Sequence, residues 1–498
     1  MDALGYAWDA VTHGSTLLAA VIGITWGIVG GSLPGISASI AIALLLPFTY
    51  GMDPVPSLVM LACAYHGAEY GGSIPAILIR TPAHGSAAAT VADGYAMHQQ
   101  GRGGEALGIS LVSGVIGNFF GVLFLVFLTK PLGEIALIFT PPAYFALGIL
   151  GISIISSLSN GAFVKGLVAA IIGLMISTVG LDPLSGVGRF TFGVPDLLGG
   201  IDYILVLIGV FALSELWRQA GDTEERKQAN RDTRIKLPGR AMLRRIRRSQ
   251  IIGTAIGIFE GCIPGAGGTV AAFLSYNEAK RWSREPELFG HGAPEGIAAP
   301  EAANNAISSS ALIPTLSFGI PGSNSSAILL GGLILHGLDP GPLLVTKNPE
   351  VVYGLFGGLF FGNIAMLAIG ILVLTPAIWL VNRPKPYLLA TVYILIVSGI
   401  YSIEQSTFDL WIVIGTGILG YFMRLLGFPV LPLVLGCVLG HMIEANYRRS
   451  LVVSSGDYTI FFHDPVSLIL LIIAAIFVIT SLVRDLRERK LNGSVQPA

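Results

Sequence analysis

The sequence predicts an all-α polytopic membrane protein, and three observations carry that prediction. The 498 residues are 53% hydrophobic and only 12% charged, whereas a soluble domain is about 25% charged. Two stretches that place Pro-Gly within apolar sequence match each other. Apolar runs of about the length that crosses a bilayer recur along the chain. These runs are 107–128, 132–155, 163–180, 201–217, 352–380, 409–422, 426–443 and 466–483.

The matching stretches are GIVGGSLPGISAS and GIFEGCIPGAGGT, and their prolines Pro34 and Pro264 differ by 264 − 34 = 230 positions. Further along, SIPAILIRTPAHGS aligns with LIPTLSFGIPGSNS, where Pro82 and Pro321 differ by 321 − 82 = 239. Two apolar halves broken by Gly and Pro at corresponding positions are typical of secondary transporters. The chain is therefore expected to contain two repeats.

The repeats divide the chain into a first membrane repeat, 1–217, a basic linker, 218–249, and a second membrane repeat, 250–444. The remainder, 445–498, is a final transmembrane helix and a tail. In the first repeat we expect a hairpin at 19–48, a broken segment at 57–95 and scaffold helices over 107–217. In the second we expect a hairpin at 250–282, a broken segment at 294–338 and scaffold helices over 352–444.

The Pro-Gly stretches are predicted to be re-entrant helical hairpins. Each apolar arm around Pro34 holds about 13 residues, or about 20 Å of helix, which is too short to cross a bilayer. One kinked helix is the alternative. The second copy favours the hairpin, because Arg248 and Lys280 lie at its two ends and basic residues favour the cytoplasmic side.

The distribution of basic residues predicts the orientation of the chain. Between Arg218 and Arg248 lie 11 of the 29 Lys and Arg residues, so the linker is expected in the cytoplasm, with the basic C-terminal tail. The N-terminus is expected outside. Loop 50–56 has no basic residue, whereas its counterpart 279–286 has three, as inverted repeats would require. Arg448, which this scheme places outside, fits the rule less well.

Two long strings resemble the large membrane subunit of tripartite tricarboxylate transporters. They include YHGAEYGGSIPAILIRTPAHGSAAATVADGYAMHQQGRGG and PEAANNAISSSALIPTLSFGIPGSNSS, and PEAANNA and FGIPGS are the most specific elements. The resemblance covers nearly the whole chain. One residue departs from the family pattern, because Arg80 stands where a polar, uncharged residue is expected.

The resemblance implies a permease subunit in the bacterial inner membrane that imports a di- or tricarboxylate, such as citrate, with a Na⁺ or H⁺ gradient. It also implies two partners, a small four-helix membrane subunit and a periplasmic solute-binding protein. No metal or other cofactor is expected. The rival functions are a stand-alone organic-anion channel or transporter and an intramembrane enzyme. A channel would need a continuous polar stripe or charged ring, and an enzyme a nucleophile–base pair; we identify neither, so no enzymatic activity is expected.

The residues at the breaks point independently to an anion site near the membrane midplane. Unwound helices expose N–H groups that hold anions and carbonyls that hold cations, although each Ser or Thr alone could simply cap a helix. We expect an elevator-like movement of the segments that carry this site. The residues predicted to bind substrate are Pro34, Gly35, Ser37, Ser73, Arg80, Thr81, Ser86, Gly265, Gly267, Gly268, Thr269, Asn304, Asn305, Pro321, Gly322, Ser323 and Asn324.

Charged residues within apolar segments are costly and often functional. Arg80 is predicted either to clamp a substrate carboxylate or to pair with Glu69. Glu301 either helps to coordinate a cation or places favourable charge at a helix N-terminus. His66 is either a proton carrier or a packing histidine. The candidates for coupling-ion ligands are Glu69, Glu301, Asn305 and Ser325.

Overall fold

The computed structural model describes residues 3–33, 36–157, 163–182, 186–221, 234–263 and 267–493. Within these ranges the only sheet is an antiparallel ribbon of two short strands, β1 (Gly180–Leu181) and β2 (Gly188–Arg189). Six described helices are long and apolar enough to cross a membrane, or seven if the bent pair Leu374–Val381 and Pro386–Ser402 is one span. The prediction of an all-α polytopic membrane protein is confirmed.

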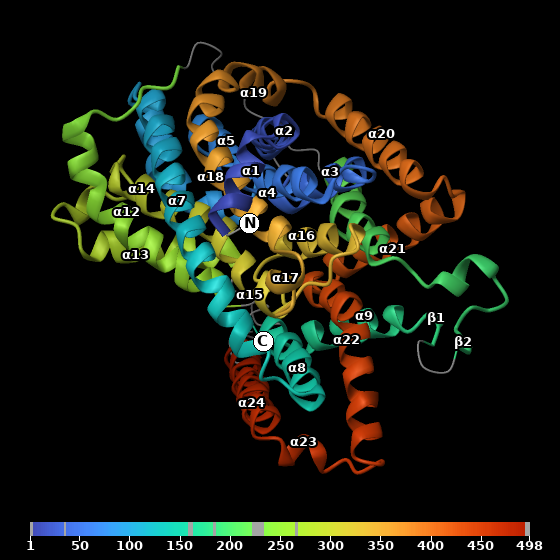
Figure 1. The fold of residues 1–498 in the computed structure, drawn as a ribbon. Coiled ribbons are helices and arrows are strands. Elements are labelled where there is room, and N and C mark those ends of the chain that lie inside the picture. Colours follow the sequence, from blue (N-terminus) through green and yellow to red (C-terminus); the bar gives the residue numbers. More distant parts are fainter. Residues whose placement is uncertain are drawn as a thin grey trace. The chain divides into compact units, whose positions relative to one another are not determined.

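The chain divides into two compact units (Figure 1). Unit 1 comprises Met1–Glu134 and Arg218–Ile403, and unit 2 comprises Ile135–Trp217 and Glu404–Ala498. Unit 1 thus contains both Pro-Gly stretches and both broken segments. Its elements are α1 (Ala3–Thr12), α2 (Gly14–Gly31), α3 (Ala38–Leu45), η1 (Leu46–Thr49), α4 (Pro54–Gly71), α5 (Ser73–Ile79), η2 (Gly85–Ala87), α6 (Ala88–Gln99), α7 (Gly103–Ala136), α12 (Arg240–Gly261), α13 (Gly267–Arg281), η5 (Pro286–Leu288), α14 (Glu295–Ser310), α15 (Leu312–Phe318), α16 (Asn324–Leu335), α17 (Leu344–Lys347), α18 (Pro349–Leu372), α19 (Leu374–Val381) and α20 (Lys385–Glu404), with α7 and α20 ending just beyond the unit boundary.

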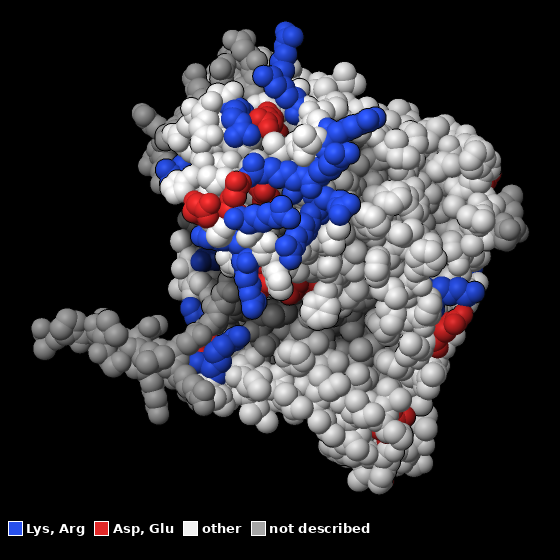
Figure 2. Space-filling model, turned by 90° about the vertical axis from the view of Figure 1, so that its left-hand side faces the viewer, with Lys and Arg blue, Asp and Glu red and all other residues white. Residues whose placement is uncertain are grey.

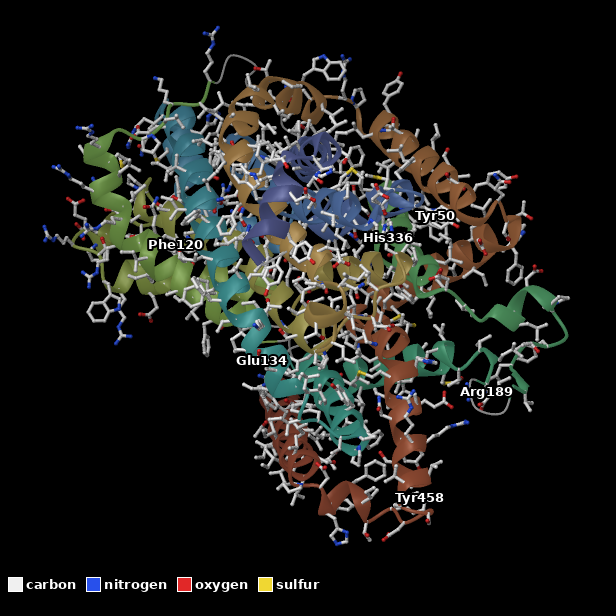
Figure 3. The ribbon with its side chains drawn as sticks, viewed as in Figure 1. Tyr50, Phe120, Glu134, Arg189, His336 and Tyr458 are labelled. Carbon is white, nitrogen blue, oxygen red and sulfur yellow. The ribbon has the colours of Figure 1, made fainter. Side chains whose placement is uncertain are left out.

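Unit 2 packs α8 against α9, α22 and α24. Arg189 (Figure 3) of the β-ribbon pairs with Glu444, and Arg448 pairs with both Asp182 and Glu444. These ion pairs tie the β-ribbon to α22 within unit 2. The elements are α8 (Pro141–Ser157), α9 (Phe163–Ser177), β1, β2, η3 (Pro195–Gly199), α10 (Tyr203–Leu207), the π-helix η4 (Ile208–Leu213), α11 (Ser214–Ala220), α21 (Thr407–Leu425), α22 (Leu431–Val453), α23 (Ile460–His463) and α24 (Pro465–Gly493).

Two prolines alter the predicted runs in opposite ways. The run 352–380 is interrupted, since α18 ends at Leu372 and α19 starts at Leu374. The ring of Pro376 would clash with the carbonyl of Leu372, four residues earlier, in a continuous helix. By contrast, α7 continues through Pro131 to Ala136, because membrane helices tolerate proline where neighbours satisfy the freed carbonyl.

Both Pro-Gly stretches form helical hairpins rather than kinked helices. In the first, the Trp26 indole of α2 donates to the Ala41 carbonyl of α3 at 2.8 Å, so α3 folds back along α2. In the second, the Arg248 guanidinium near the start of α12 donates to the Trp282 carbonyl beyond the end of α13 at 3.1 Å. The chain therefore returns along itself in both copies.

Glycines allow the first arm of each hairpin to lie directly against a helix backbone. Gly27 of α2 contacts the backbone of Ala64 in α4, and Gly257 of α12 contacts the backbone of Ala303 in α14. A Cβ atom at Gly257 would lie 2.8 Å from the Ala303 Cα. Small residues of this kind are what permit close packing of membrane helices.

We expect Gly257→Ala to lower the thermal stability of the purified protein, because its methyl group would push α12 away from α14. Gly415→Ala is the matched control, since a Cβ atom added to this helical glycine would have no neighbouring atom within 4 Å. Alanine is favoured over glycine in a helix by about 1 kcal/mol, so the control should melt at the same or a higher temperature. Equal melting temperatures for both variants would contradict the packing argument.

Candidate functional site

In each broken segment, the short helix just before the break ends with the same turn. The first break, 80–84, follows α5, and the Thr81 N–H donates to the Pro75 carbonyl at 3.2 Å. The second break, 319–323, follows α15, and the Ile320 N–H donates to the Pro314 carbonyl at 3.3 Å. In both copies this bond reaches back six positions along the chain, and the residue just before its donor is left-handed.

Arg80 and Gly319 occupy that left-handed position, with φ of 60° and 71°. Arg80 is exposed, and its guanidinium lies 6.0 Å from the centroid of the Tyr95 ring. The Glu69 carboxylate instead has His84 as its ion-pair partner, so the predicted pairing of Arg80 with Glu69 is not found. A role for Arg80 as a substrate clamp stays a prediction.

At the first break, polar side chains meet the start of α13. A Cβ at Gly85 would lie 2.5 Å from the Thr269 hydroxyl oxygen. A Cβ at Gly268 would lie 2.7 Å from the Asn304 Oδ1 and 3.0 Å from the Ser86 Oγ. The structure therefore brings together four residues that the sequence predicts to bind substrate, Ser86, Gly268, Thr269 and Asn304.

At the second break, a serine cluster meets the start of α3. The Ser39 and Ser325 hydroxyls lie 3.1 Å apart, and the Tyr65 hydroxyl lies 3.0 Å from the Ser323 hydroxyl. Ser323 also caps α16 in a reciprocal capping box with Ser326. Tyr65 lies one helical turn before Glu69 on α4 and interacts with it electrostatically, which links this serine cluster to the first break.

At each break, one contacting helix is the returning hairpin arm from the other half of the sequence. The returning arm α3 of the first hairpin lies against α16 after the second break, and the returning arm α13 lies against η2 after the first break. The N-termini of α3, α13 and α16 thereby approach the polar residues. Free N–H groups and the helix dipole at such ends favour a negatively charged ligand.

Buried polar atoms without hydrogen-bond partners mark the centre of this region. Glu69 Oε2, His84 Nε2 and both amide atoms of Asn304 are buried without a well-aligned hydrogen-bond partner, although the Asn304 side chain lies close enough to Glu69 to interact with its carboxylate. His84 Nε2 lies 3.7 Å from Glu69 Oε2, and its Nδ1 lies 3.1 Å from the Ser86 hydroxyl. Buried polar groups are normally paired, so we define Glu69, His84, Ser86 and Asn304 as the candidate substrate cluster.

A second buried carboxylate, Glu301, lies one turn before Asn305 on α14. It accepts hydrogen bonds from Ser73 at 2.6 Å, Thr90 at 2.5 Å and Ser110 at 2.9 Å. Ser73 thus faces Glu301 rather than the candidate substrate cluster. Ser73 and Glu301 are 228 positions apart in the sequence, so the tertiary structure brings them together.

Asn305 bonds to a backbone carbonyl and to Asn118 rather than to the candidate substrate cluster. Its amide donates to the Glu301 backbone carbonyl at 3.0 Å, and the Asn118 amide donates to its Oδ1 at 3.5 Å. His66 Nε2 lies 3.0 Å from the Ser309 hydroxyl, and its two predicted roles, proton carrier and packing histidine, both stay predictions.

The start of α14 is fixed by a buried aspartate of α6. Asp93 Oδ1 accepts the backbone N–H groups of Gly290, Gly292 and Ala293 at 2.8, 2.9 and 2.8 Å. The Tyr276 hydroxyl of α13 donates to its other oxygen at 2.9 Å. One carboxylate therefore ties α6, α13 and the loop before α14 together, and so positions the helix that carries Glu301 and Asn304.

The remaining predicted residues have local or packing roles, or lie outside the described ranges. Ser37 caps α3, and the Thr81 hydroxyl donates to the Ile79 carbonyl. Gly322 packs against the Gly261 carbonyl, where a Cβ would approach to 2.8 Å. Pro321 is buried, Asn324 is exposed and Gly267 has a φ of 73°. Pro34, Gly35 and Gly265 lie outside the described residues.

Sequence reasoning missed four residues of these clusters, which are His84, Tyr65, Thr90 and Ser110. His84 carried a usable signal, because it is a titratable side chain within an apolar broken segment. Thr90 and Ser110 carried none, since isolated hydroxyls occur throughout membrane helices and only the tertiary structure brings them to Glu301.

These features define a polytopic membrane protein with a buried polar site at two helix breaks. The model of the TctA family of tripartite tricarboxylate transporters matches residues 17–435. The chain therefore belongs to the TctA family, and the predicted family is confirmed. Membership implies that it works as one component of a tripartite transporter.

Two curated relatives from Agrobacterium vitis are similar to this chain. An uncharacterized 52.8 kDa protein in the TAR-I ttuC' 3' region is 36% identical over 469 residues, covering 94% of this chain and 93% of the relative. An uncharacterized protein in the TAR-II ttuC' 3' region is 36% identical over 230 residues, covering 46% of this chain and 95% of that relative. No solved structure matches the chain significantly.

We expect Arg80→Gly to be more stable than Arg80→Ala by about 1 kcal/mol, because glycine adopts the left-handed conformation without a Cβ penalty. Both variants lose the contact with Tyr95, so the comparison isolates the backbone. Thermal melting of the two proteins measures the difference. An Arg80→Ala protein as stable as Arg80→Gly would show that the turn at Arg80 is not strained.

Proposed function

We propose that this chain is the substrate-carrying permease subunit of a transporter that imports a di- or tricarboxylate, driven by a cation gradient. The candidate substrate cluster carries the proposal. It combines buried, unpaired polar atoms with helix N-termini at two breaks in an otherwise apolar unit. Binding sites at broken helices are the rule for secondary transporters with repeats.

The chemistry of the cluster suits a carboxylate that also bears a hydroxyl group. The Asn304 amide and the Ser86 hydroxyl offer donors to a carboxylate, as do the N–H groups that start α13. Asn304 Oδ1 is a buried acceptor without a donor. A substrate hydroxyl would supply that donor, so we propose a hydroxy-substituted di- or tricarboxylate of the citrate type.

Matching contacts support two structural repeats, which we propose to be inverted. Gly27 lies on Ala64 and Gly257 lies on Ala303, and these pairs are related by 257 − 27 = 230 and 303 − 64 = 239, the offsets that relate the repeats in sequence. Unit 1 contains both hairpins and both breaks, so we propose it as the element that carries substrate in an elevator-like movement. In this unit α18 packs against α2 of the first hairpin, and the Gln250 amide of α12 donates to the Ser113 hydroxyl of α7, although the sequence groups α7 and α18 with the scaffold.

The charge distribution supports a cytoplasmic position for the linker and the C-terminal tail, in the bacterial inner membrane. Figure 2 shows Lys and Arg gathered on one face, and exposed basic residues lie at the start of α12 and the end of α13. Basic residues favour the cytoplasmic side. The partners we propose are a small four-helix membrane subunit and a periplasmic solute-binding protein.

We expect Asn304→Ala to lower carboxylate uptake about ten-fold at unchanged expression. Loss of a buried hydrogen-bond partner costs about 1–3 kcal/mol, and about 1.4 kcal/mol is ten-fold in affinity. Uptake of radiolabelled citrate would be measured in cells that express all three subunits, with other hydroxy-carboxylates as competitors.

Asn363→Ala is the matched control. It removes another buried asparagine of unit 1, whose amide donates to the Val115 carbonyl on α7, away from the breaks. Both variants should lose some stability, but only Asn304→Ala should lose uptake. Equal uptake by the two variants, at equal amounts of folded protein, would contradict the proposed substrate site.

A further inference from the structure

The open end of the second hairpin, opposite its Pro-Gly tip, carries a group of exposed basic side chains on the face shown in Figure 2. We propose that this end binds the headgroup of an anionic phospholipid, whose acyl chains lie along exposed apolar faces of α12 and α13. We define the basic end of the hairpin as Arg244, Arg247, Arg248, Lys280, Arg281 and Trp282. Lipid binding here does not depend on the proposed transport function.

The exposed face of α12 changes from basic to apolar along the helix. Arg244 and Arg248 are followed, at intervals of three or four residues, by Ile251, Ala255 and Phe259, all of which are exposed. Side chains at this spacing share one face of a helix. The 259 − 248 = 11 residues from Arg248 to Phe259 cover about 16 Å at 1.5 Å each.

The exposed face of α13 has the same order in space, because the chain returns along itself. Val270, Phe273 and Leu274 are exposed near the tip, and Lys280 and Arg281 are exposed at the open end. The 280 − 270 = 10 residues from Val270 to Lys280 cover about 15 Å. Both faces therefore match the depth of one leaflet, which is half of a hydrocarbon core of about 30 Å.

Some charges of this region are already compensated within the protein. Arg245 pairs with Glu285 at 2.7 Å and with Glu295 at 2.8 Å. Arg281 lies 3.5 Å from Glu278. The nearby carboxylates are therefore shared with these two arginines.

Three other cations of the basic end lack such a partner. Arg244, Arg247 and Lys280 are exposed and make no ion pair within the part of the chain that the structure describes. Clusters of Lys and Arg beside a membrane helix bind anionic lipid headgroups. The uncompensated charge therefore favours a phospholipid with a net negative charge over a zwitterionic one.

Trp282 places the basic end at the level of lipid headgroups. Its side chain is 52% exposed, and the guanidinium groups of Arg248 and Arg281 lie 5.1 and 5.9 Å from the centroid of its ring. Tryptophan is enriched where the hydrocarbon core meets water. The Arg248 guanidinium also donates to the Trp282 carbonyl, so it is oriented before a lipid binds.

The first hairpin shows that a hairpin of this kind folds without basic residues. The chain contains no Lys or Arg before Arg80, yet α3 returns along α2, as the bond from Trp26 to Ala41 shows. The two hairpins thus share their fold and differ in charge. We therefore assign the charge of the second hairpin to binding rather than to folding.

The test is the melting temperature of the purified full chain in detergent, with added dioleoyl phosphatidylglycerol or dioleoyl phosphatidylcholine. The two lipids have the same acyl chains, so only the headgroup differs. The melting temperature should rise further with phosphatidylglycerol and saturate, since a ligand that binds only the folded state stabilises it. Glycerol 3-phosphate, which has the charge but no acyl chain, should have no effect.

The triple variant Arg244→Gln, Arg247→Gln, Lys280→Gln removes the uncompensated charges. Each basic residue near an anionic lipid contributes about five-fold in affinity, so the triple variant should bind phosphatidylglycerol roughly 100-fold more weakly. If the triple variant does not fold, the single variants Arg247→Gln and Lys280→Gln should each weaken binding about five-fold.

The matched control is the triple variant Lys130→Gln, Lys347→Gln, Arg383→Gln. These three basic residues of unit 1 are exposed and lie outside the second hairpin. Their replacement changes the net charge by the same amount and should leave the response to phosphatidylglycerol unchanged.

Four results would overturn the proposal. They are an equal response to the two lipids, an equal response to glycerol 3-phosphate, a phosphatidylglycerol response that persists in the hairpin variants, and an equal loss of response in the control. A response lost only in the hairpin variants would support the site. Because uptake is not measured, that result would stand even if the protein imported no carboxylate.

Discussion

The structure of unit 1 depends on how it satisfies backbone groups at two helix breaks. Lipid offers no hydrogen-bond partners, so broken helices persist at membrane depth only where protein or a polar cavity supplies them. Each break here begins with a backbone hydrogen bond that reaches back six positions, donated by Thr81 or by Ile320. The returning arm of the hairpin from the other half also contacts each break. The two halves therefore meet at both breaks.

The contact between the two halves has a functional consequence, because it brings polar side chains together inside an otherwise apolar unit. The first break brings His84 and Ser86 to Asn304, and the second brings Ser323 and Ser325 to Tyr65 and Ser39. Two buried carboxylates, Glu69 and Glu301, lie on the helices that precede the breaks. A site with this composition offers hydrogen-bond donors to an organic anion, as the proposed carboxylate transport requires.

The sequence predicts the architecture better than it predicts the residue contacts. Pro-Gly stretches and repeated offsets locate both hairpins and both breaks, because local backbone chemistry decides where a membrane helix ends. The partner of a given side chain depends on which helix faces lie together. Ser73 and Asn305 show this: both lie near a break in sequence, yet one faces Glu301 and the other Asn118. Arg80 shows it too, because its left-handed backbone at the end of α5 and its place beside Tyr95 are visible only in the structure.

The central claim is that the two halves are inverted copies whose hairpins enter from opposite sides of the membrane. Impermeant thiol labelling in a cysteine-free background tests it most directly, at Tyr50→Cys after the first hairpin and Arg284→Cys after the second. Tyr50 (Figure 3) is 53% exposed, and Arg284 is also exposed. In intact cells we expect Tyr50→Cys to react and Arg284→Cys to react only after permeabilisation. Reaction of both positions from the same side would contradict the inverted arrangement.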